Sequence, residues 1–454
     1  MNYATAVSNL YALGHELHLT PGYKFDLAHM RMLVEALGNP QQSFRAVLVA
    51  GTNGKGSTCA TLASILRAAG YKTALYTSPH LVRVNERIRV DGVPISDAEF
   101  AKAYEQVQHA ASKLVAAGRL PHMPSFFETI TAMAFLHFAA SGVAIAVLEV
   151  GMGGRLDATN VVEPCLTVIT DIDLDHQKYL GSTITEIAKE KAGILRMGVA
   201  AITLPQHPQA NEVLGAAIIA IGARAVSAAR NVPPVSPGSE ELVSSSRGRT
   251  KFELEVLGDT INIDSPLIGR HQLRNLALAI TAAEELAENG IPISGQQIEQ
   301  GVRETQWAGR FQTISATAQH PEIVFDVAHN PAGAWALRAA LNENFGERRQ
   351  VFVFGAMRDK AIREMAQILF PPAEVVITAT ASHTPRAATG EEIAAIAAEV
   401  GSNAVAKANV KEALAAAFAA AKDLAGRGRG EPLVVIAGSI YIVGEAMELL
   451  GVEV

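Results

Sequence analysis

A segment near the N-terminus has the residue types and spacing needed to bind phosphate. Residues 47–50 (VLVA) form a short apolar run typical of a buried strand, and residues 51–58 (GTNGKGST) follow at once. The three glycines allow backbone N–H groups to approach an anion, and the residues after them are typical of a helix whose N-terminus would face that anion. Lys55 is suited to contact the outer phosphates of a nucleotide, and the Ser57 hydroxyl to contact a magnesium ion. We therefore predict a nucleotide phosphate-binding loop that contains Gly54, Lys55, Gly56 and Ser57.

The loop departs from the usual Walker pattern in two places. That pattern has a glycine where this chain has Val49, and a serine or threonine where Gly56 follows Lys55. The alternative interpretation is a glycine-rich turn that binds no ligand. The strand–loop–helix context favours nucleotide binding, so the departure indicates a distinct subgroup of phosphate loops.

Polar residues follow three other apolar runs. Ser78 comes after the first run, Glu149 lies near the end of the second, and Asp175 and His176 come after the third. Because ligand groups in α/β proteins collect beyond the carboxyl ends of strands, we expect these side chains near the phosphate loop. A buried glutamate is costly without a cation, so Glu149 is suited to hold magnesium. The alternatives are a simple turn at Ser78 and a solvated loop face at the Asp–His pair.

Two further features each allow two interpretations. The adjacent aromatic residues Phe126 and Phe127 are either core side chains or a flat platform for an aromatic ligand. Lys191 lies on a predicted helix that ends at Gly193, and its simplest interpretation is a surface lysine paired with a nearby glutamate.

The elements that must position these residues alternate between strands and helices in two series, which is typical of α/β proteins. The first series has strands at 73–76, 144–150 and 165–170 and helices over 3–17, 27–37, 96–117, 124–140, 186–191 and 271–287. A loop over 226–250 and a hairpin over 251–264, turning at Gly258-Asp259, complete it. The second series has strands at 323–327, 350–354, 374–378 and 433–437, with alanine-rich helices between them, notably 411–424.

We place the boundary between the two series within residues 301–312. The predicted fold is thus α/β, with a P-loop doubly wound N-terminal domain over residues 1–305 and a smaller Rossmann-like C-terminal domain over residues 306–454.

Composition and charge disfavour several classes of protein. The chain has 454 residues, of which 49% are hydrophobic and 18% charged, as is typical of a well-packed globular protein. The net charge of −7 disfavours a nucleic-acid surface, and polar residues interrupt the most apolar window, residues 132–150. Residues 1–8 do not suggest a signal peptide, and two cysteines cannot form a disulfide framework. We expect a cytoplasmic monomer with neither a nucleic-acid partner nor a membrane partner.

Taken in order, the motifs resemble those of the folylpolyglutamate synthase/dihydrofolate synthase family, within the Mur ligase superfamily. The resemblance covers nearly the whole chain. Its anchors are GTNGKGST at 51–58, SPHL at 78–81, NER at 85–87, EVGMGGRLDATN at 149–160, DH at 175–176, EKAGI at 190–194, GRF at 309–311 and DVAHNP at 326–331.

The resemblance implies ATP-dependent ligation of L-glutamate to the carboxylate of a folate, and also of dihydropteroate, through an acyl phosphate. It implies two magnesium ions, one held by Ser78 and Glu149 and the other by His176. It also implies that Lys191 is carbamylated, since a carbamate is an oxygen ligand able to bind Mg²⁺.

The same resemblance implies the remaining site residues. Besides the phosphate loop, the implied ATP contacts are Asn275, Arg310 and Asp326. The implied glutamate-binding residues are His329 and Ser439, and the implied pterin-side pocket has Phe126, Phe127, Leu156, Asp157 and Ala158. The implied catalytic residues are Lys55, Lys191, Asp326 and His329.

Two other classes of function are weighed against this one. A Mur-type ligase joins an amino acid to a UDP-muramoyl precursor, but its loop resembles Gly-Lys-Thr, and only about 45 residues precede the loop here, too few for a UDP-binding domain. A nucleotide switch or transport ATPase is the other alternative, and the absence of a guanine-reading Asn-Lys-x-Asp disfavours a GTPase. The sequence leaves open which folates are used and how long the product chain becomes.

Overall fold

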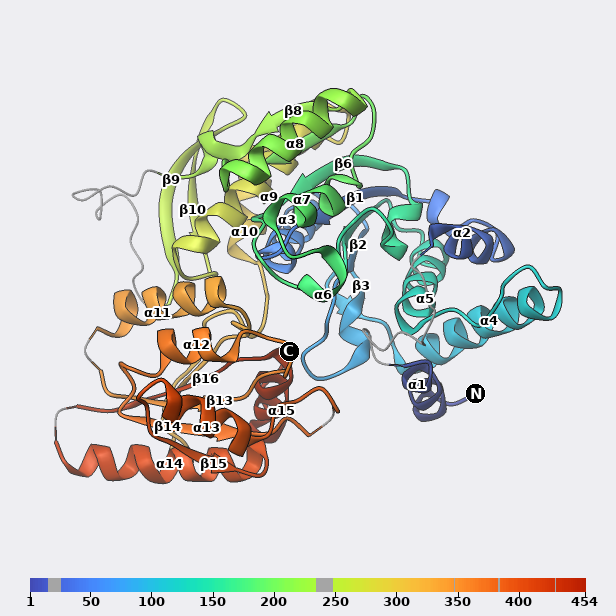
Figure 1. Ribbon diagram of the computed structural model, residues 1–454. Helices are drawn as coiled ribbons and strands as arrows, with labels where there is room; N and C mark the ends of the chain where they lie inside the picture. The colour runs from blue at the N-terminus through green and yellow to red at the C-terminus, as the bar shows by residue number, and fades with distance from the viewer. Residues whose placement is uncertain (15–25, 234–247, 347, 383, 429) are drawn as a thin grey trace.

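The computed structural model of the chain describes residues 1–454 apart from residues 15–25, 234–247, 347, 383 and 429. It contains two sheets of mostly parallel strands, and helices cover both faces of each sheet (Figure 1). The prediction of an α/β fold with a doubly wound phosphate-loop sheet and a second, smaller sheet is confirmed.

The first sheet has eight strands. They are β1 (Arg45–Ala50), β2 (Thr73–Tyr76), β3 (Ile88–Val90), β4 (Val93–Pro94), β5 (Ile145–Glu149), β6 (Pro164–Ile169), β7 (Ala200–Thr203) and β8 (Arg224–Ser227). Their order is β4-β3-β2-β5-β1-β6-β7-β8, and β3 and β4 are the antiparallel strands at one edge. Val47 and Val49 of the central strand β1 pack in one core, and Leu48 and Ala50 pack in the other. The apolar run is therefore a strand buried on both faces.

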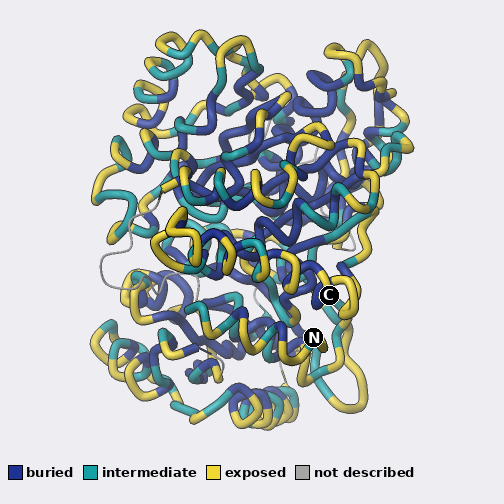
Figure 2. The backbone as a smooth tube through the Cα atoms, turned by 90° about the vertical axis from the view of Figure 1, so that its right-hand side faces the viewer, coloured by how far each residue is buried: buried dark blue, intermediate teal, exposed yellow. Residues whose placement is uncertain are grey.

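In the described part of the chain, ten α-helices accompany this sheet, and most of them cover its two faces. They are α1 (Tyr3–Ala12), α2 (Leu27–Ala36), α3 (Lys55–Ala68), α4 (Asp97–Ala116), α5 (Phe126–Ala140), α6 (Gln177–Leu180), α7 (Ile184–Ala192), α8 (Pro208–Ile221), α9 (Arg270–Glu288) and α10 (Gly295–Arg303). Apolar residues of α3, α9 and α10 share the core of Val47, whereas α2, α4, α5, α7 and α8 share the core of Leu48. Figure 2 shows these buried segments as a dark blue interior inside exposed helix faces and loops.

The register of the central strands brings the predicted site residues to one edge. β1 pairs with β5 and β6 in parallel, with Val49 opposite Glu149 and Ala50 opposite Ile169. The phosphate loop, Glu149 and the segment after β6 therefore leave the sheet side by side.

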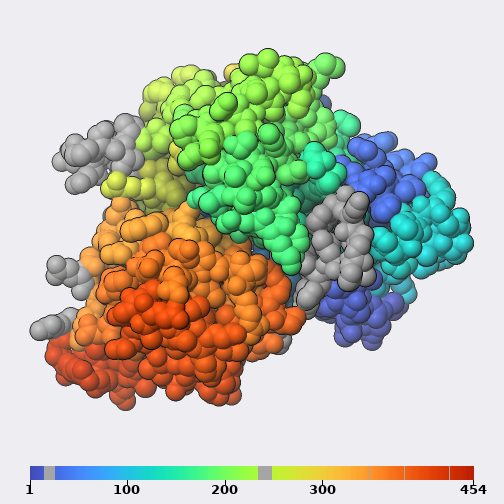
Figure 3. All heavy atoms as spheres, viewed as in Figure 1, coloured from blue at the N-terminus to red at the C-terminus, as the bar shows by residue number. Residues whose placement is uncertain are grey.

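The second sheet comes from the C-terminal part of the chain. Its strands are β11 (Gln312–Ile314), β12 (Glu322–Phe325), β13 (Gln350–Phe354), β14 (Val375–Ala379), β15 (Ala404–Lys407) and β16 (Leu433–Ala437), in the order β11-β12-β16-β13-β14-β15. Its helices are α11 (Pro331–Phe345), α12 (Ile362–Leu369), α13 (Gly390–Glu399), α14 (Val410–Gly426) and α15 (Ile440–Leu450). This part forms its own lobe, drawn orange to red in Figure 3, in contact with the green segments of the first part.

The structure corrects several details of the prediction. α1 ends at Ala12 with Leu13 as its C-cap and Gly14 at a φ of 100°, and residues 15–17 of the predicted helix lie outside the described residues. Most of the predicted loop over 226–250 also lies outside them, and its described start contains the end of β8. The hairpin joins β9 (Thr250–Val256) to β10 (Asp259–Ser265), and it turns at Leu257 and Gly258 rather than at Gly258-Asp259. Asp259 instead pairs with Val256, because a two-residue turn already reverses the chain.

Among the described residues, no helix has the length and apolar character that crossing a membrane requires.

Candidate active site

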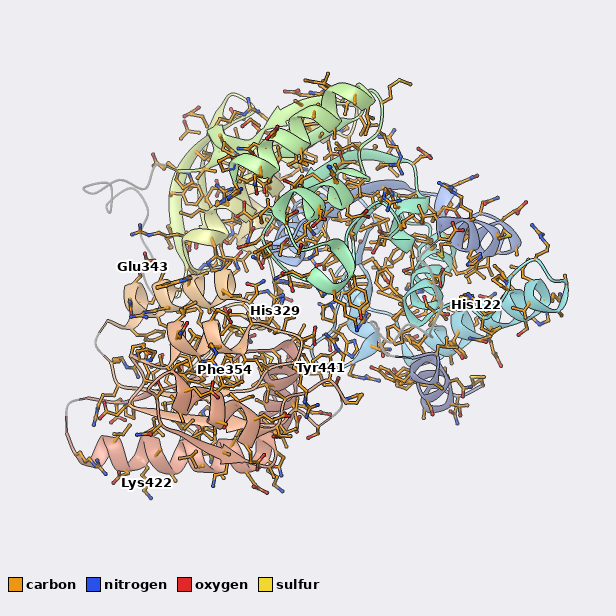
Figure 4. The ribbon with its side chains drawn as sticks, in the orientation of Figure 1. His122, His329, Glu343, Phe354, Lys422 and Tyr441 are labelled. Carbon is orange, nitrogen blue, oxygen red and sulfur yellow. The ribbon has the colours of Figure 1, made fainter. Side chains whose placement is uncertain are left out.

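A cavity of about 710 Å³ lies where the two sheets direct the carboxyl ends of their strands toward each other. Its lining residues follow β1, β2, β5 and β6 in the first sheet and β12, β13 and β16 in the second. In Figure 4, His329 lies where the two parts of the chain meet. The site residues predicted from the sequence that line this cavity are Gly54, Lys55, Gly56, Ser57, Ser78, Phe127, Glu149, Leu156, Asp157, Ala158, His176, Lys191, Asn275, Arg310, Asp326, His329 and Ser439.

The phosphate loop joins β1 to α3 and packs directly on α9. Gly54 precedes α3 with a φ of 87°, a left-handed conformation that favours glycine. A Cβ at Gly54 would lie 2.0 Å from Asn275 Oδ1, so only glycine allows this approach. Asn275 Nδ2 donates to Gln272 Oε1 at 2.8 Å, which fixes the orientation of the Asn275 amide. Lys55 Nζ donates to the Thr52 carbonyl oxygen at 3.1 Å, which holds the ammonium over the loop.

The glycine that departs from the Walker pattern makes room for an indole ring. A Cβ at Gly56 would lie 2.7 Å from Trp307 Cζ2. The Arg310 guanidinium lies over the same ring, with Cζ 5.9 Å from its centroid. A serine or threonine at position 56 would have to displace Trp307. Gly56 therefore replaces the serine or threonine of the Walker pattern because Trp307, from the segment that leads into the second sheet, packs against the phosphate loop.

Glu149 and Ser78 are brought together at the ends of β5 and β2. Glu149 is buried, and its Oε2 accepts a hydrogen bond from the Ser78 backbone N–H at 3.1 Å. Burial raises the pKa of Glu149, and the nearby cation of Lys55 opposes that rise. A divalent cation would favour the ionised carboxylate further, and the Ser78 hydroxyl would add a second oxygen ligand of the kind that Mg²⁺ prefers.

His176 is suited to bind a metal through an unpaired nitrogen. Its Nδ1 is buried and has no hydrogen-bond partner among the described residues. Burial lowers its pKa to about 3, so the imidazole is neutral at physiological pH. Within the described part of the chain, no three His, Cys, Asp or Glu side chains form a complete metal cage. Because Mg²⁺ is commonly held by one or two protein ligands together with substrate phosphates, the donors present fit a magnesium ion shared with ATP.

Lys191 is buried, so the surface ion pair considered from the sequence is not formed. Its Nζ donates to the Gly51 carbonyl oxygen at 2.7 Å. Glu190 instead pairs with Arg155 at 2.8 Å, and Glu186 caps its own helix at Thr183. Burial, followed by the neighbouring Lys55 cation, lowers the pKa of Lys191 to about 7.

The second sheet supplies the opposite wall of the cavity. Asp326, directly after β12, accepts hydrogen bonds from the backbone N–H groups of Phe311 at 2.9 Å and Ala328 at 2.8 Å. His329 Nδ1 lies 2.9 Å from the Val327 carbonyl oxygen, so Nδ1 carries the hydrogen and Nε2 faces the cavity side. Ser439 caps α15, where its Oγ accepts the Ile442 N–H at 3.2 Å.

The two adjacent aromatic residues point in different directions. Phe127 lines the cavity, and a Cβ at Gly151 would lie 2.5 Å from its Cζ. Phe126 is buried outside the cavity, stacked on Tyr11 with centroids 5.5 Å apart and beneath the Arg87 guanidinium. Successive helix residues differ by about 100° in direction, so both cannot form one platform. The platform interpretation is wrong for Phe126.

The chain matches two known domain families, which together span most of its length. Residues 49–283 match the Mur ligase middle domain, and residues 309–440 match the Mur ligase glutamate ligase domain. The chain is 37% identical over 382 residues to a dihydrofolate synthase/folylpolyglutamate synthase of Bacillus subtilis, covering 82% of this chain and 84% of that protein. The chain belongs to this family. It is therefore an ATP-dependent ligase, as the sequence analysis expected, and the Mur ligases are the wider superfamily.

Solved structures of the family share the whole fold. A folylpolyglutamate synthase of Mycobacterium tuberculosis complexed with ADP and AMPPCP has a TM-score of 0.89 and 31% identity, covering 99% of both chains. A structure described as an FPGS–AMPPCP–folate complex has a TM-score of 0.82 and 33% identity, covering 99% of this chain and all of that one.

Sequence reasoning missed several residues in and beside the cavity, of which Gln272 and Lys360 line it. Gln272 orients Asn275, Trp307 covers Gly56, and Lys360 approaches Asp175 from the second sheet. Lys360 follows the carboxyl end of β13. The expectation that ligand groups collect beyond the carboxyl ends of strands, which identified Ser78, therefore applies to Lys360 as well. Trp307 and Gln272 carry no comparable signal, because Trp307 contacts Gly56 far away in the sequence and Gln272 lies inside α9, where it contacts Asn275 one turn along.

Proposed function

We propose that this enzyme joins L-glutamate to the carboxylate of a folate, and also to that of dihydropteroate, with ATP as the energy source. One observation carries the proposal: a single cavity holds the phosphate loop, an apolar end at Phe127 and Leu156, and polar side chains of the second sheet at His329 and Ser439. Family membership supports the reaction class, and the AMPPCP and folate held by the related structure support the substrate classes.

We assign to the cavity residues the roles that the family resemblance implies. Gly54, Lys55, Gly56 and Ser57 would bind the ATP phosphates, with Asn275, Arg310 and Asp326 as further ATP contacts. Phe127, Leu156, Asp157 and Ala158 would contact the pterin side, and His329 and Ser439 the incoming glutamate. Ser78, Glu149 and His176 would hold magnesium, which when bound neutralises phosphate charge.

A carboxylate has no good leaving group, so it must be activated before an amine can attack it. The substrate carboxylate attacks the γ-phosphorus of ATP and ADP leaves, giving an acyl phosphate. Lys55 and Arg310 would stabilise the charge that spreads over the transferred phosphoryl group. The neutral amine of glutamate then attacks the acyl carbon, phosphate departs, and the amine loses a proton. Both sheets face this cavity, which would keep water from the acyl phosphate.

Lys191 is proposed to be carbamylated. Carbon dioxide adds only to a neutral amine, and burial beside Lys55 lowers the pKa of Lys191 to about 7, where a neutral amine is available. The carbamate would convert a cation in the cavity into an oxygen ligand for Mg²⁺. We further propose two magnesium ions, a cytoplasmic location and a monomeric state, with small molecules as the binding partners.

Incorporation of radiolabelled glutamate tests the function. Dihydropteroate and tetrahydrofolate are compared side by side with ATP and magnesium, and each component is omitted in turn. The proposal expects labelled product with both acceptors and no phosphate release unless acceptor and glutamate are present. Labelled product with a UDP-muramoyl acceptor only, or ATP hydrolysis that ignores folate and glutamate, would contradict it.

A further inference from the structure

An ion pair between the two parts of the chain lies beside the proposed reaction centre. Lys360 is in the segment between β13 and α12, and its Nζ lies 2.5 Å from Asp175 Oδ1 in the segment after β6. Both side chains line the cavity and are only 9% exposed. The assignment of residues proposed above uses neither of them.

The Asp175 carboxylate connects Lys360 to two histidines of the site. Oδ1 also accepts the His176 backbone N–H at 2.7 Å. Oδ2 lies 3.8 Å from His176 Nε2 and 3.6 Å from His329 Nε2. The carboxylate therefore pairs with a cation from the opposite sheet and lies within 4 Å of a proposed metal ligand and a proposed glutamate ligand.

A second polar contact crosses the same boundary close by. Asn330 Nδ2 donates to Asn53 Oδ1 of the phosphate loop at 2.9 Å, while Asn330 Oδ1 accepts the Gly333 N–H at 2.8 Å and caps α11. The second sheet thus contacts both the phosphate loop and the segment that carries His176 through polar side chains of defined orientation.

A buried ion pair of this kind depends on both partners being in place. A charge left in the cavity without its partner is strongly unfavourable, whereas both charges are well solvated when the two parts of the chain are separated. The pair therefore forms only in the docked arrangement, and it fixes one relative position of the two sheets.

We propose that Lys360 is a positioning residue whose ion pair with Asp175 locks the two domains together and sets His329 and His176 for ligation. This inference rests on the proposed function. In the productive step, the glutamate nitrogen bonds to the acyl carbon, the bond from that carbon to the phosphate oxygen breaks, phosphate takes the electron pair, and the amine loses a proton. In the wasteful step, water replaces the amine and returns the free carboxylic acid and phosphate. The lock favours the productive step because it aligns the amine site and excludes water.

The test measures phosphate released per glutamate incorporated by the full-length enzyme. Lys360→Met removes the charge and keeps most of the side-chain length, and Lys360→Arg keeps the charge. Arg270→Met is the matched control, because Arg270 and Glu343 form another ion pair across the boundary, at 2.5 Å, that is 62% and 34% exposed and outside the cavity. Glu343 is labelled on α11 in Figure 4.

The lock predicts a specific pattern across these variants. Lys360→Met should lower the rate of ligation at least tenfold and raise the phosphate-to-product ratio several-fold over wild type, with the melting temperature nearly unchanged. Lys360→Arg should recover part of the ratio, and Arg270→Met should behave as wild type. A wild-type ratio and rate in Lys360→Met would overturn the proposal. Equal losses of phosphate release and of ligation, together with a lowered melting temperature, would also overturn the proposal, because a residue with a purely structural role would give that result.

Two further controls keep the result interpretable. If Lys360→Met does not fold, Lys360→Gln is judged by the same ratio. Wild-type enzyme that releases no phosphate in response to a folate and glutamate would refute the proposed function, whereas normal wild-type coupling with an unchanged ratio in the Lys360 variants would refute the lock alone.

Discussion

Lys191 donates from its Nζ to the Gly51 carbonyl oxygen across 2.7 Å and so joins α7 to the first residue of the phosphate loop. Burial and the nearby Lys55 cation lower its pKa to about 7, while Asp175 and Asp157 act in the opposite direction. At pH 7 about half of the molecules then carry a neutral amine, against roughly one in three thousand for a lysine of ordinary pKa.

Ligation should therefore depend on pH and on carbon dioxide through Lys191. The neutral amine becomes more abundant as pH rises through 7, so the carbamate, and with it the activity, should increase between about pH 6 and 8 at constant dissolved CO₂. Lys191→Ala should lower ligation by roughly 10–100-fold or more with little change in melting temperature. Lys189→Ala, which replaces an exposed lysine on the same helix, is the control.

A carbamate signal from ¹³C-bicarbonate in the wild type, lost in Lys191→Ala, would support the assignment. Plain lysine density with carbonate and magnesium present, together with an active alanine variant, would refute it.

Lys55→Ala should remove ligation and leave the fold intact. The Lys55 side chain lines the cavity and donates a hydrogen bond to the loop carbonyl of Thr52, so its loss removes charge stabilisation rather than core packing. We expect kcat to fall by roughly 10²–10³-fold or more. Lys72→Ala, at an exposed position just before β2, is the matched control. Near-normal turnover by Lys55→Ala in steady-state assays would remove the phosphate-loop assignment.

Gly444→Ala should disturb the contact between the two domains. A Cβ at Gly444 on α15 would lie 1.9 Å from the Leu81 carbonyl oxygen, only three residues beyond Ser78. Either α15 or the Ser78 segment must move, at a cost of about 1–3 kcal/mol, and ligation should fall. Gly215→Ala is the control, because Gly215 lies within α8 with nothing near its missing Cβ, and it should be neutral or slightly stabilising. Thermal unfolding and ligation are measured on both, and an active Gly444→Ala enzyme of normal stability would show that this contact is not required.

Separating the chain after residue 305 should abolish catalysis, because Arg310 and Asp326 would be lost from the first piece. Burial lowers the pKa of Arg310 and raises that of Asp326, and each group opposes the shift of the other, so the two act as a pair in the intact chain. Pieces 1–305 and 306–454 are expressed alone and assayed for ATP-dependent glutamate incorporation. Product made by the first piece alone would show that the second domain does not contribute to the ATP site.

The sequence predicted best what depends on local pattern. β2, β13 and β16 have the bounds predicted from the sequence, and the glycines of the phosphate loop lie where the backbone needs them. The sequence could not decide between two interpretations that depend on the direction of a side chain or on a contact with a residue far away in the chain. Nothing local distinguishes Phe126, which packs on Tyr11, from Phe127, which lines the cavity. The contact of Lys360 with Asp175 joins residues 185 positions apart, so it depends on how the two sheets dock rather than on any local pattern.

The indole packed on Gly56 also gives this enzyme a built-in optical reporter. The chain has two tryptophans, and Trp335 is 58% exposed on α11 beneath the Arg338 guanidinium. Replacing Trp335 by phenylalanine would leave the fluorescence of Trp307 alone, and both the phosphate loop and the Arg310 cation lie close to that ring. Because indole emission responds to nearby charge, its intensity should change as phosphate groups enter the loop. Nucleotide arrival and departure can then be followed in real time without an added label.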